Sequence, residues 1–349
     1  MSARPRARPR ARGQRGAGLT AVALTVAGAL HASSLAAQTT SGPCTVAPAV
    51  ASGADACQKA RDLFGFVVPQ IGIAVSSGNP VLGEGGTLGG WPKRAFSFRV
   101  SAVDGQLPRN AVPISVTGSA VGSDFGAART PIPLPSADAA IGIFPGIPLG
   151  LTNTLGVDLL LGASYLPSVK KSNFEVAPND GGFAVQYGVR VGALQESSFI
   201  PGLSVSYMRR KMPTVDLGYT PNNDTLTVTG TSVTSNAIRI VASKRFAIFG
   251  IAAGVGRDEI EGSASMRASV NETVFGINQR FSVLLPDLRY TTKRNTAFVN
   301  ASLGLGIARL VGEYGWSSEG TVRETVNQFG GRKADEGYRY GSLGIAFRF

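Results

Sequence analysis

Apolar and polar side chains alternate along most of the sequence beyond about residue 67. In residues 184–193 every second side chain is apolar, and Gln, Gly and Arg stand between them. Similar patterns recur in residues 95–103, 157–165 and 275–285. A period of two is typical of strands with one apolar face, and each segment is close to the ~9–11 residues with which a tilted strand crosses a bilayer.

These segments predict an all-β fold, a single transmembrane antiparallel up-and-down β-barrel of about 14 strands within a range of roughly 12–16. The predicted strands are residues 68–78, 94–104, 113–123, 137–149, 155–167, 183–195, 202–211, 235–243, 246–256, 262–271, 275–286, 294–305, 308–317 and 338–349.

Loop lengths agree with a membrane barrel, because outer-membrane barrels have short periplasmic turns and longer outer loops. If the C-terminus lies in the periplasm, long gaps fall outside at 79–93, 124–136, 168–182, 212–234 and 318–337. Short gaps then fall inside at 150–154, 196–201, 244–245, 272–274 and 306–307. The exceptions are fairly short outer gaps at 257–261 and 287–293 and a mid-length inner gap at 105–112. A soluble sandwich has no reason to sort its loops in this way.

The sequence ends inside a strand, on an aromatic residue. Leu343, Ile345, Phe347 and Phe349 share one face of this strand, and Tyr340 lies on the other. The backbone of a last strand needs a partner, and closure onto the first strand of a barrel provides one. In hydrocarbon this closure is obligatory, because no water satisfies an open edge.

The N-terminal residues have the layout of a secretory signal peptide. Six arginines precede an apolar run from about Ala17 to Leu30, and small residues near Ala37 offer a cleavage point. The predicted organisation is a signal peptide at 1–37, a periplasmic or plug segment at 38–67 and the barrel at 68–349.

Two features lie in or near the segment 38–67. Residues 51–64 predict one short helix, with Ser52 as its cap. Cys44 and Cys57 are the only cysteines of the chain. In an oxidising periplasm we expect them to form a disulfide that acts as a local staple.

The terminal strand, the leader and the repeated hairpins resemble those of bacterial outer-membrane β-barrel proteins. About 14 strands behind an N-terminal extension are similar to the long-chain fatty-acid transporters and the monomeric porins, without a family-specific motif. The resemblance implies that the protein lies in the cell outer membrane. It also implies that the barrel-assembly machinery reads a signal formed by Tyr340, Leu343, Ile345, Phe347 and Phe349.

The sequence offers little for catalysis or metal binding. Its single histidine, His31, lies in the leader, so none remains to serve as a general base. The resemblance implies that enzymes among these barrels use such a base. Asp158 and Glu313 are candidate inward acids on distant strands. We therefore expect no enzyme activity, no cofactor and no metal site.

Arginines dominate the polar faces of the strands. A charge on the lipid face costs roughly 2–4 kcal/mol at mid-depth, so these faces are expected to line the lumen. The lumen-facing candidates are Arg99, Asp158, Arg190, Arg210, Arg239, Arg267, Arg280, Arg309, Glu313 and Arg348. Because rings of arginine favour anions in pores, the pattern predicts a channel or transporter for small or amphipathic, anionic solutes. The competing interpretation is that the arginines pair with carboxylates of loops or a plug and hold the barrel closed.

Two other functions stay open: a non-conducting structural or adhesive outer-membrane barrel, and a secreted soluble β-protein. Loss of the six leader arginines lowers the formal net charge from +12 to about +6, so nucleic acid is not an expected partner. The expected partners are outer-membrane lipid and lipopolysaccharide, together with the barrel-assembly machinery. Residues 209–211 are a basic run near an outer rim that would suit lipopolysaccharide. The chain is expected to be a monomer.

Overall fold

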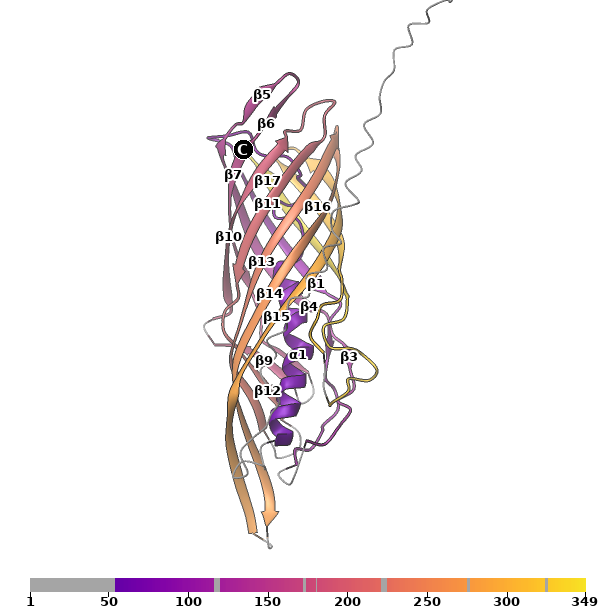
Figure 1. The fold of residues 1–349 in the computed structure, drawn as a ribbon. Helices are drawn as coiled ribbons and strands as arrows, with labels where there is room; N and C mark the ends of the chain where they lie inside the picture. The colour runs from indigo at the N-terminus through magenta and orange to yellow at the C-terminus, as the bar shows by residue number, and fades with distance from the viewer. Residues whose placement is uncertain are drawn as a thin grey trace, which may run out of the picture. The chain divides into compact units, whose positions relative to one another are not determined.

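The computed structural model describes residues 54–115, 120–171, 174–179, 181–220, 225–274, 277–323 and 326–349. The predicted signal peptide and residues 38–53, with Cys44, lie outside this part of the chain. Within it, ten antiparallel strands form a closed barrel around an N-terminal helix, and the last strand pairs with the first (Figure 1). The predicted all-β barrel with a helical extension is confirmed.

The barrel strands follow one another around the ring in chain order. They are β1 (Arg94–Val103), β4 (Ile132–Phe144), β7 (Gly156–Tyr165), β10 (Phe183–Leu194), β11 (Gly202–Lys211), β13 (Thr225–Phe246), β14 (Phe249–Val274), β15 (Ile277–Leu305), β16 (Ala308–Ser317) and β17 (Tyr338–Arg348). Three short strands extend the sheet beyond the ring, β8 (Val169–Lys171), β9 (Phe174–Pro178) and β12 (Val215–Tyr219). Two small two-stranded sheets complete the structure, β2 (Gln106–Leu107) with β3 (Ala128–Arg129) and β5 (Ile147–Leu149) with β6 (Thr152–Thr154).

The ring has four strands fewer than the 14 predicted, because β14 and β15 are long and because two predicted strands are not strands. β14 has 26 residues and β15 has 29, and each includes two of the predicted strands. Residues 257–261, a predicted loop, are charged at four of five positions. They instead continue the strands beyond the hydrocarbon, where a side chain on the outer face meets water.

The first predicted strand, residues 68–78, is instead the second half of a helix, α1 (Ala54–Ser76). All but two of the 23 residues of α1 are buried. Its second half, residues 68–76, has only Gln70 and Ser76 as polar side chains, so it lacks the polar face from which a helix is recognised. Burial inside the barrel outweighs the β-propensity of its Val and Ile residues. The predicted strand at 113–123 is also absent from its described residues, because the backbone N–H groups of Ser115 and Val121 bind Asp55 of α1.

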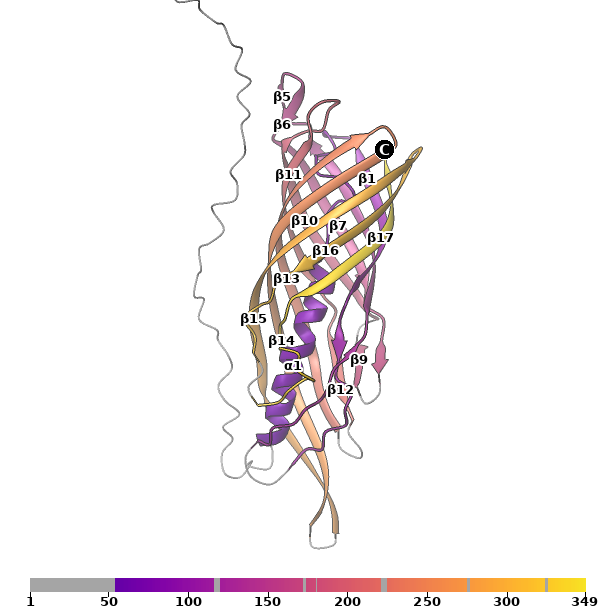
Figure 2. The same cartoon turned by 90° about the vertical axis from the view of Figure 1, so that its right-hand side faces the viewer.

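The two ends of the barrel differ. At the end where the chain terminates, the connections are short, such as residues 247–248 and 306–307. Most connections at the other end are long, such as 104–131 and 318–337, although only two residues separate β14 from β15. Short turns face the periplasm in such barrels, so the C-terminal end is periplasmic and the long strands reach outward (Figure 2).

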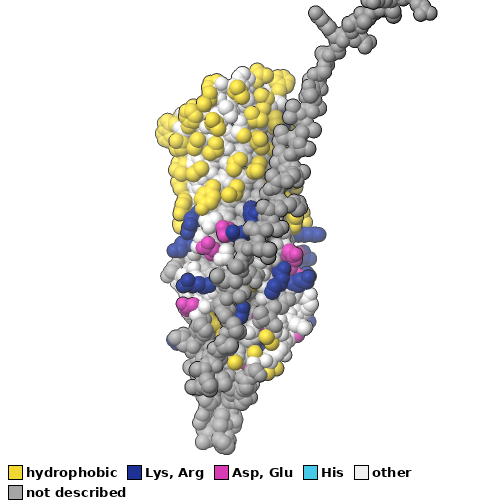
Figure 3. All heavy atoms as spheres, viewed as in Figure 1, with side chains coloured by type: hydrophobic (Ala, Val, Ile, Leu, Met, Phe, Trp, Pro, Cys, Tyr) yellow, Lys and Arg dark blue, Asp and Glu magenta, His cyan; other side chains and the backbone are white. Residues whose placement is uncertain are grey.

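An apolar belt covers the periplasmic half of the barrel on the face seen in Figure 3, and each of the ten barrel strands exposes large apolar side chains. On β10, outward Phe183, Val185 and Tyr187 are 68%, 62% and 54% exposed, and they alternate with buried residues. Lys, Arg, Asp and Glu gather on the outside just beyond the belt. A soluble protein would expose this belt to water, whereas a bilayer covers it. The chain is therefore an outer-membrane β-barrel protein.

The belt uses several residues of the predicted terminal signal. Leu343, Ile345 and Phe349 are exposed, Phe347 is half-buried, and Tyr340 points inward and is buried. Among the described residues, no helix combines the length and apolar character needed to span a membrane.

Candidate functional site

The lumen contains α1 and the extended segment that follows it, and we call residues 54–90 the plug. Ala54 begins the helix at the extracellular end, and Ser76 ends it inside the barrel (Figure 1). Residues 77–90 then lead to β1, whose first residue, Arg94, pairs with Phe349 at the periplasmic end. The plug therefore follows the length of the barrel, and its contacts with the wall form the candidate site.

Most of the predicted lumen residues face this plug. Buried on the inner face are Arg99, Asp158, Arg190, Arg210, Arg239 and Glu313. Arg309 and Arg348 are half-buried near the periplasmic mouth. The side chain of Arg280 lies outside the described residues.

Arg267 is the exception, since its side chain is exposed on the outer face of β14. The rule that apolar side chains point outward holds only in the belt. Beyond the belt, water lies outside and a hydrophobic core that includes Met266 lies inside, so the rule reverses.

Two arginines of the wall hold the C-terminal end of α1. Arg239 donates from Nη2 to the Ser76 carbonyl oxygen at 2.9 Å, and Arg210 donates from Nη1 to the same oxygen at 3.3 Å. The last carbonyl groups of a helix lack intrahelical partners and carry negative partial charge, so cations stabilise them. Arg239 also pairs with Asp258 at 2.6 Å, and the Ser76 hydroxyl donates to the same carboxylate at 3.3 Å.

The extended part of the plug is held at Asn79. Its backbone N–H donates to Glu313 at 2.9 Å, and its carbonyl oxygen accepts from Arg99 at 2.9 Å. Asn300 of β15 binds both the Asn79 side chain and Glu313. Glu313 and Arg99 thus bind the backbone N–H and the carbonyl oxygen of Asn79, which fixes the position of this residue against the wall.

Asp158 holds the plug near Leu88. Both of its carboxylate oxygens accept from the Leu88 N–H at 3.2 Å, and Arg190 pairs with it at 2.7 Å. Asp158, Arg190 and Leu88 are all buried. This arrangement neutralises a buried carboxylate and binds a backbone donor at the same time.

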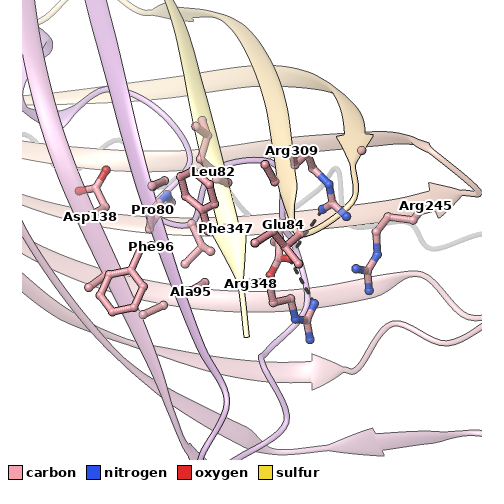
Figure 4. Close-up of a pocket in the computed structure, with 18 of the residues that line it drawn as sticks. Pro80, Leu82, Glu84, Ala95, Phe96, Asp138, Arg245, Arg309, Phe347 and Arg348 are labelled. Atoms are coloured by element: carbon pink, nitrogen blue, oxygen red, sulfur yellow. Dashed lines mark hydrogen bonds and ion pairs between the residues drawn. The ribbon is translucent and has the colours of Figure 1, made fainter.

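A pocket of about 300 Å³ opens at the periplasmic mouth (Figure 4). Glu84 of the plug pairs there with Arg348 at 3.2 Å and Arg309 at 3.7 Å, while Arg245 also lines the pocket and pairs with Glu196 at 3.2 Å. Asp138 also lines the pocket and pairs with Arg99 at 3.2 Å. Counting Arg99 and Glu196 as the partners of lining residues, four arginines around three carboxylates leave a net charge of about +1, which suits an anion.

At the extracellular end, acidic residues of α1 bind two loops. Asp55 accepts from the N–H groups of Ser115 and Val121, and Asp62 accepts from the N–H groups of Val326 and Asn327. Helix residue Phe66 also stacks on Phe329, at a centroid distance of 4.1 Å. The helix is thus the core of the extracellular half.

A further acid, Asp124, links the same two loops to each other. It accepts from the N–H groups of Gly126 at 2.8 Å and Gly330 at 2.7 Å, and these bonds hold the pKa of its carboxyl below the usual value. The acids that hold the plug and loops include Asp62, Glu84, Asp124 and Asp258. None of these was predicted as a site residue, because all four lie outside the predicted strands.

Within the described residues, no group of three or more His, Cys, Asp and Glu side chains is placed to hold a metal ion. Cys57 is disulfide-bonded and buried, while Cys44 lies outside the described residues.

Solved structures with the same architecture are similar to this chain at low identity. The outer-membrane protease OmpT from Escherichia coli is 9% identical, with a TM-score of 0.35 over 74% of this chain and 96% of its own. The translocator domain of the autotransporter NalP from Neisseria meningitidis is 11% identical, with a TM-score of 0.36 over 87% and 100%. These similarities concern the fold alone. No protein-family model matches the sequence, and no curated protein matches it.

The prediction that the chain is not an enzyme is corrected by this comparison. An outer-membrane protease is among the similar solved structures, which conflicts with that expectation. The lack of histidine beyond His31 leaves carboxylate and hydroxyl chemistry available.

Proposed function

We propose that this chain is a closed outer-membrane barrel whose extracellular half provides a surface for binding a partner. The observation that carries the proposal is the plug, which follows the lumen and bonds to the wall at Ser76, Asn79 and Leu88. The buried lumen arginines act as holders of the plug. This corresponds to the structural or adhesive alternative rather than to an open pore.

The construction of the extracellular half supports the second part of the proposal. β14 and β15 are two to three times longer than the ~9–11 residues that cross a bilayer, so much of each stands outside it. α1 and the loops form a hydrophobic core there, around Phe66, Phe125 and Phe329. An extracellular half with its own hydrophobic core holds its loops in fixed positions, as a binding surface requires.

A second candidate function is the passage of small or amphipathic anionic solutes. The pocket with Arg245, Arg309 and Arg348 favours it, because an anion at the periplasmic mouth would find an excess of positive charge. Passage of a solute would require the plug to detach from the wall, since polar groups of the plug at Ser76, Asn79 and Leu88 are hydrogen-bonded to wall side chains.

Labelling of intact cells tests the extracellular surface. Lys333→Cys, in the loop between β16 and β17, is expected to react fully with a membrane-impermeant maleimide. Phe199→Cys, in the turn between β10 and β11, is expected to react only after the outer membrane is opened. Both native side chains are exposed, so accessibility in the folded protein is matched. Labelling of Phe199→Cys but not of Lys333→Cys on intact cells would reverse the orientation and remove the proposal.

A further inference from the structure

The lipid-facing side of the barrel contains a groove of about 720 Å³. Its floor includes Ala137 of β4, Ala163 of β7 and Gly344 of β17, all small residues. Phe98, Phe183 and Leu343 also line the groove, and they are 61%, 68% and 62% exposed. The hollow therefore results from small side chains among large ones within the apolar belt.

Prolines in β4 contribute to the hollow as well, because the β4–β7 pairing ends beside them. Arg94 and Phe349 exchange both backbone hydrogen bonds, and this fixes which residues of β1 face β17 and which face β4. Pro133 and Pro135 lie opposite Ala102 and Val100, two β1 residues whose backbone groups point to β17. The backbone N atoms of both prolines therefore point away from β1, toward β7. Proline has no N–H to donate, and the pairing of β4 with β7 ends at Ser136 and Ser164.

Positive charge lies at the extracellular rim above the groove. Arg339 is on the outward face of β17, four residues from Leu343, or about 13 Å along the strand. The Asp104 backbone N–H donates to the Arg339 carbonyl oxygen at 2.9 Å, and the Asp104 carboxylate pairs with Arg129. Two arginines around one aspartate leave a net charge of about +1.

Trp316 places this rim at the membrane–water interface. It pairs with Arg339 across β16 and β17 and is 52% exposed. Exposed tryptophan is enriched at this depth of a bilayer. The groove thus lies in hydrocarbon, and the two arginines lie at the level of lipid headgroups.

We propose that this groove binds one anionic lipid of the outer leaflet, with an acyl chain over Ala137 and Ala163 and the headgroup at Arg129 and Arg339. The apolar belt supplies the hydrocarbon environment that an acyl chain needs, and the excess charge at the rim favours a phosphate over a zwitterionic headgroup. The site lies on the outside of the barrel and does not depend on whether the lumen is closed.

Native mass spectrometry of the full-length, delipidated protein in detergent tests the site. The probes are phosphatidic acid and phosphatidylcholine with identical chains. We expect one phosphatidic acid to bind about tenfold more tightly than phosphatidylcholine, the ratio that one favourable charge contact of ordinary strength produces. The double variant Arg129→Gln/Arg339→Gln is expected to bind the two lipids equally.

Filling the groove tests the acyl-chain part. Ala137→Trp is expected to weaken both lipids by about tenfold, because the indole occupies the hollow. Ala253→Trp is the matched control, since Ala253 is exposed on the outward face of β14. Retained heat-modifiable migration on gels shows that each variant is folded. Equal lipid binding by the two tryptophan variants would overturn the proposal, as would a dimer in the spectra whose interface Ala137→Trp abolishes.

Discussion

Replacing Arg239 by alanine is expected to destabilise the folded barrel by about 3–5 kcal/mol, because the substitution leaves Asp258 buried without its cation. Both side chains of this pair are 1% exposed. The same change removes the shorter of the two arginine bonds to the Ser76 carbonyl oxygen, so the C-terminal end of α1 loses much of its support. Urea titration of the protein refolded into lipid vesicles measures the free energy of unfolding.

Arg209→Ala is the matched control for this prediction. Arg209 lies on β11, next to β13, but its side chain is exposed on the outer face of the barrel. Its removal is expected to change the free energy of unfolding by at most about 0.5 kcal/mol. If the two alanine variants unfold at the same urea concentration, the arginines do not hold the plug.

Replacing Asp335 by alanine is expected to release the loop between β16 and β17, at a cost of about 3–5 kcal/mol. Asp335 pairs with Arg294 of β15, and neither side chain is exposed. Its carboxylate also accepts from the Thr292 hydroxyl at 2.6 Å and the Val322 N–H at 3.0 Å. The alanine leaves the Arg294 guanidinium buried, and within the described part of the chain no other carboxylate forms an ion pair with it.

Limited proteolysis of folded protein measures the release of this loop. Cleavage after Arg332 or Lys333 by trypsin is expected to become at least tenfold faster in Asp335→Ala, because local opening exposes the backbone. Glu336→Ala is the control, since its ion pair with Arg332 is partly exposed and contributes little. Equal cleavage of both variants would show that the buried pair does not fix the loop.

Alternation in the sequence was sufficient to predict a barrel, because a membrane wall has one face in hydrocarbon along each strand. The alternation correctly places Arg209 on the outer face and its neighbour Arg210 on the inner face, since successive side chains point to opposite faces. The same rule misassigned Arg267, because the strand continues beyond the bilayer and the solvent on its outer face changes from lipid to water.

The partners of the arginines could not be predicted from the sequence. Arg210 and Ser76 are 134 residues apart, and the contact requires α1 to lie inside the barrel. Residues 68–76 are rich in Val and Ile, which suit a strand, and only burial on every side makes them helical. A channel was the first interpretation because an arginine face looks the same in sequence whether it faces water or a helix terminus.

The conductance of the wild-type protein in a planar lipid bilayer tests the closed lumen most directly. The full-length chain, refolded and inserted under applied voltage in a salt gradient, is expected to show no steady current, while Arg239→Ala is expected to show brief openings. A steady ohmic conductance of the wild-type protein, with a reversal potential that indicates anion selectivity, would contradict the closed barrel and favour the anion channel.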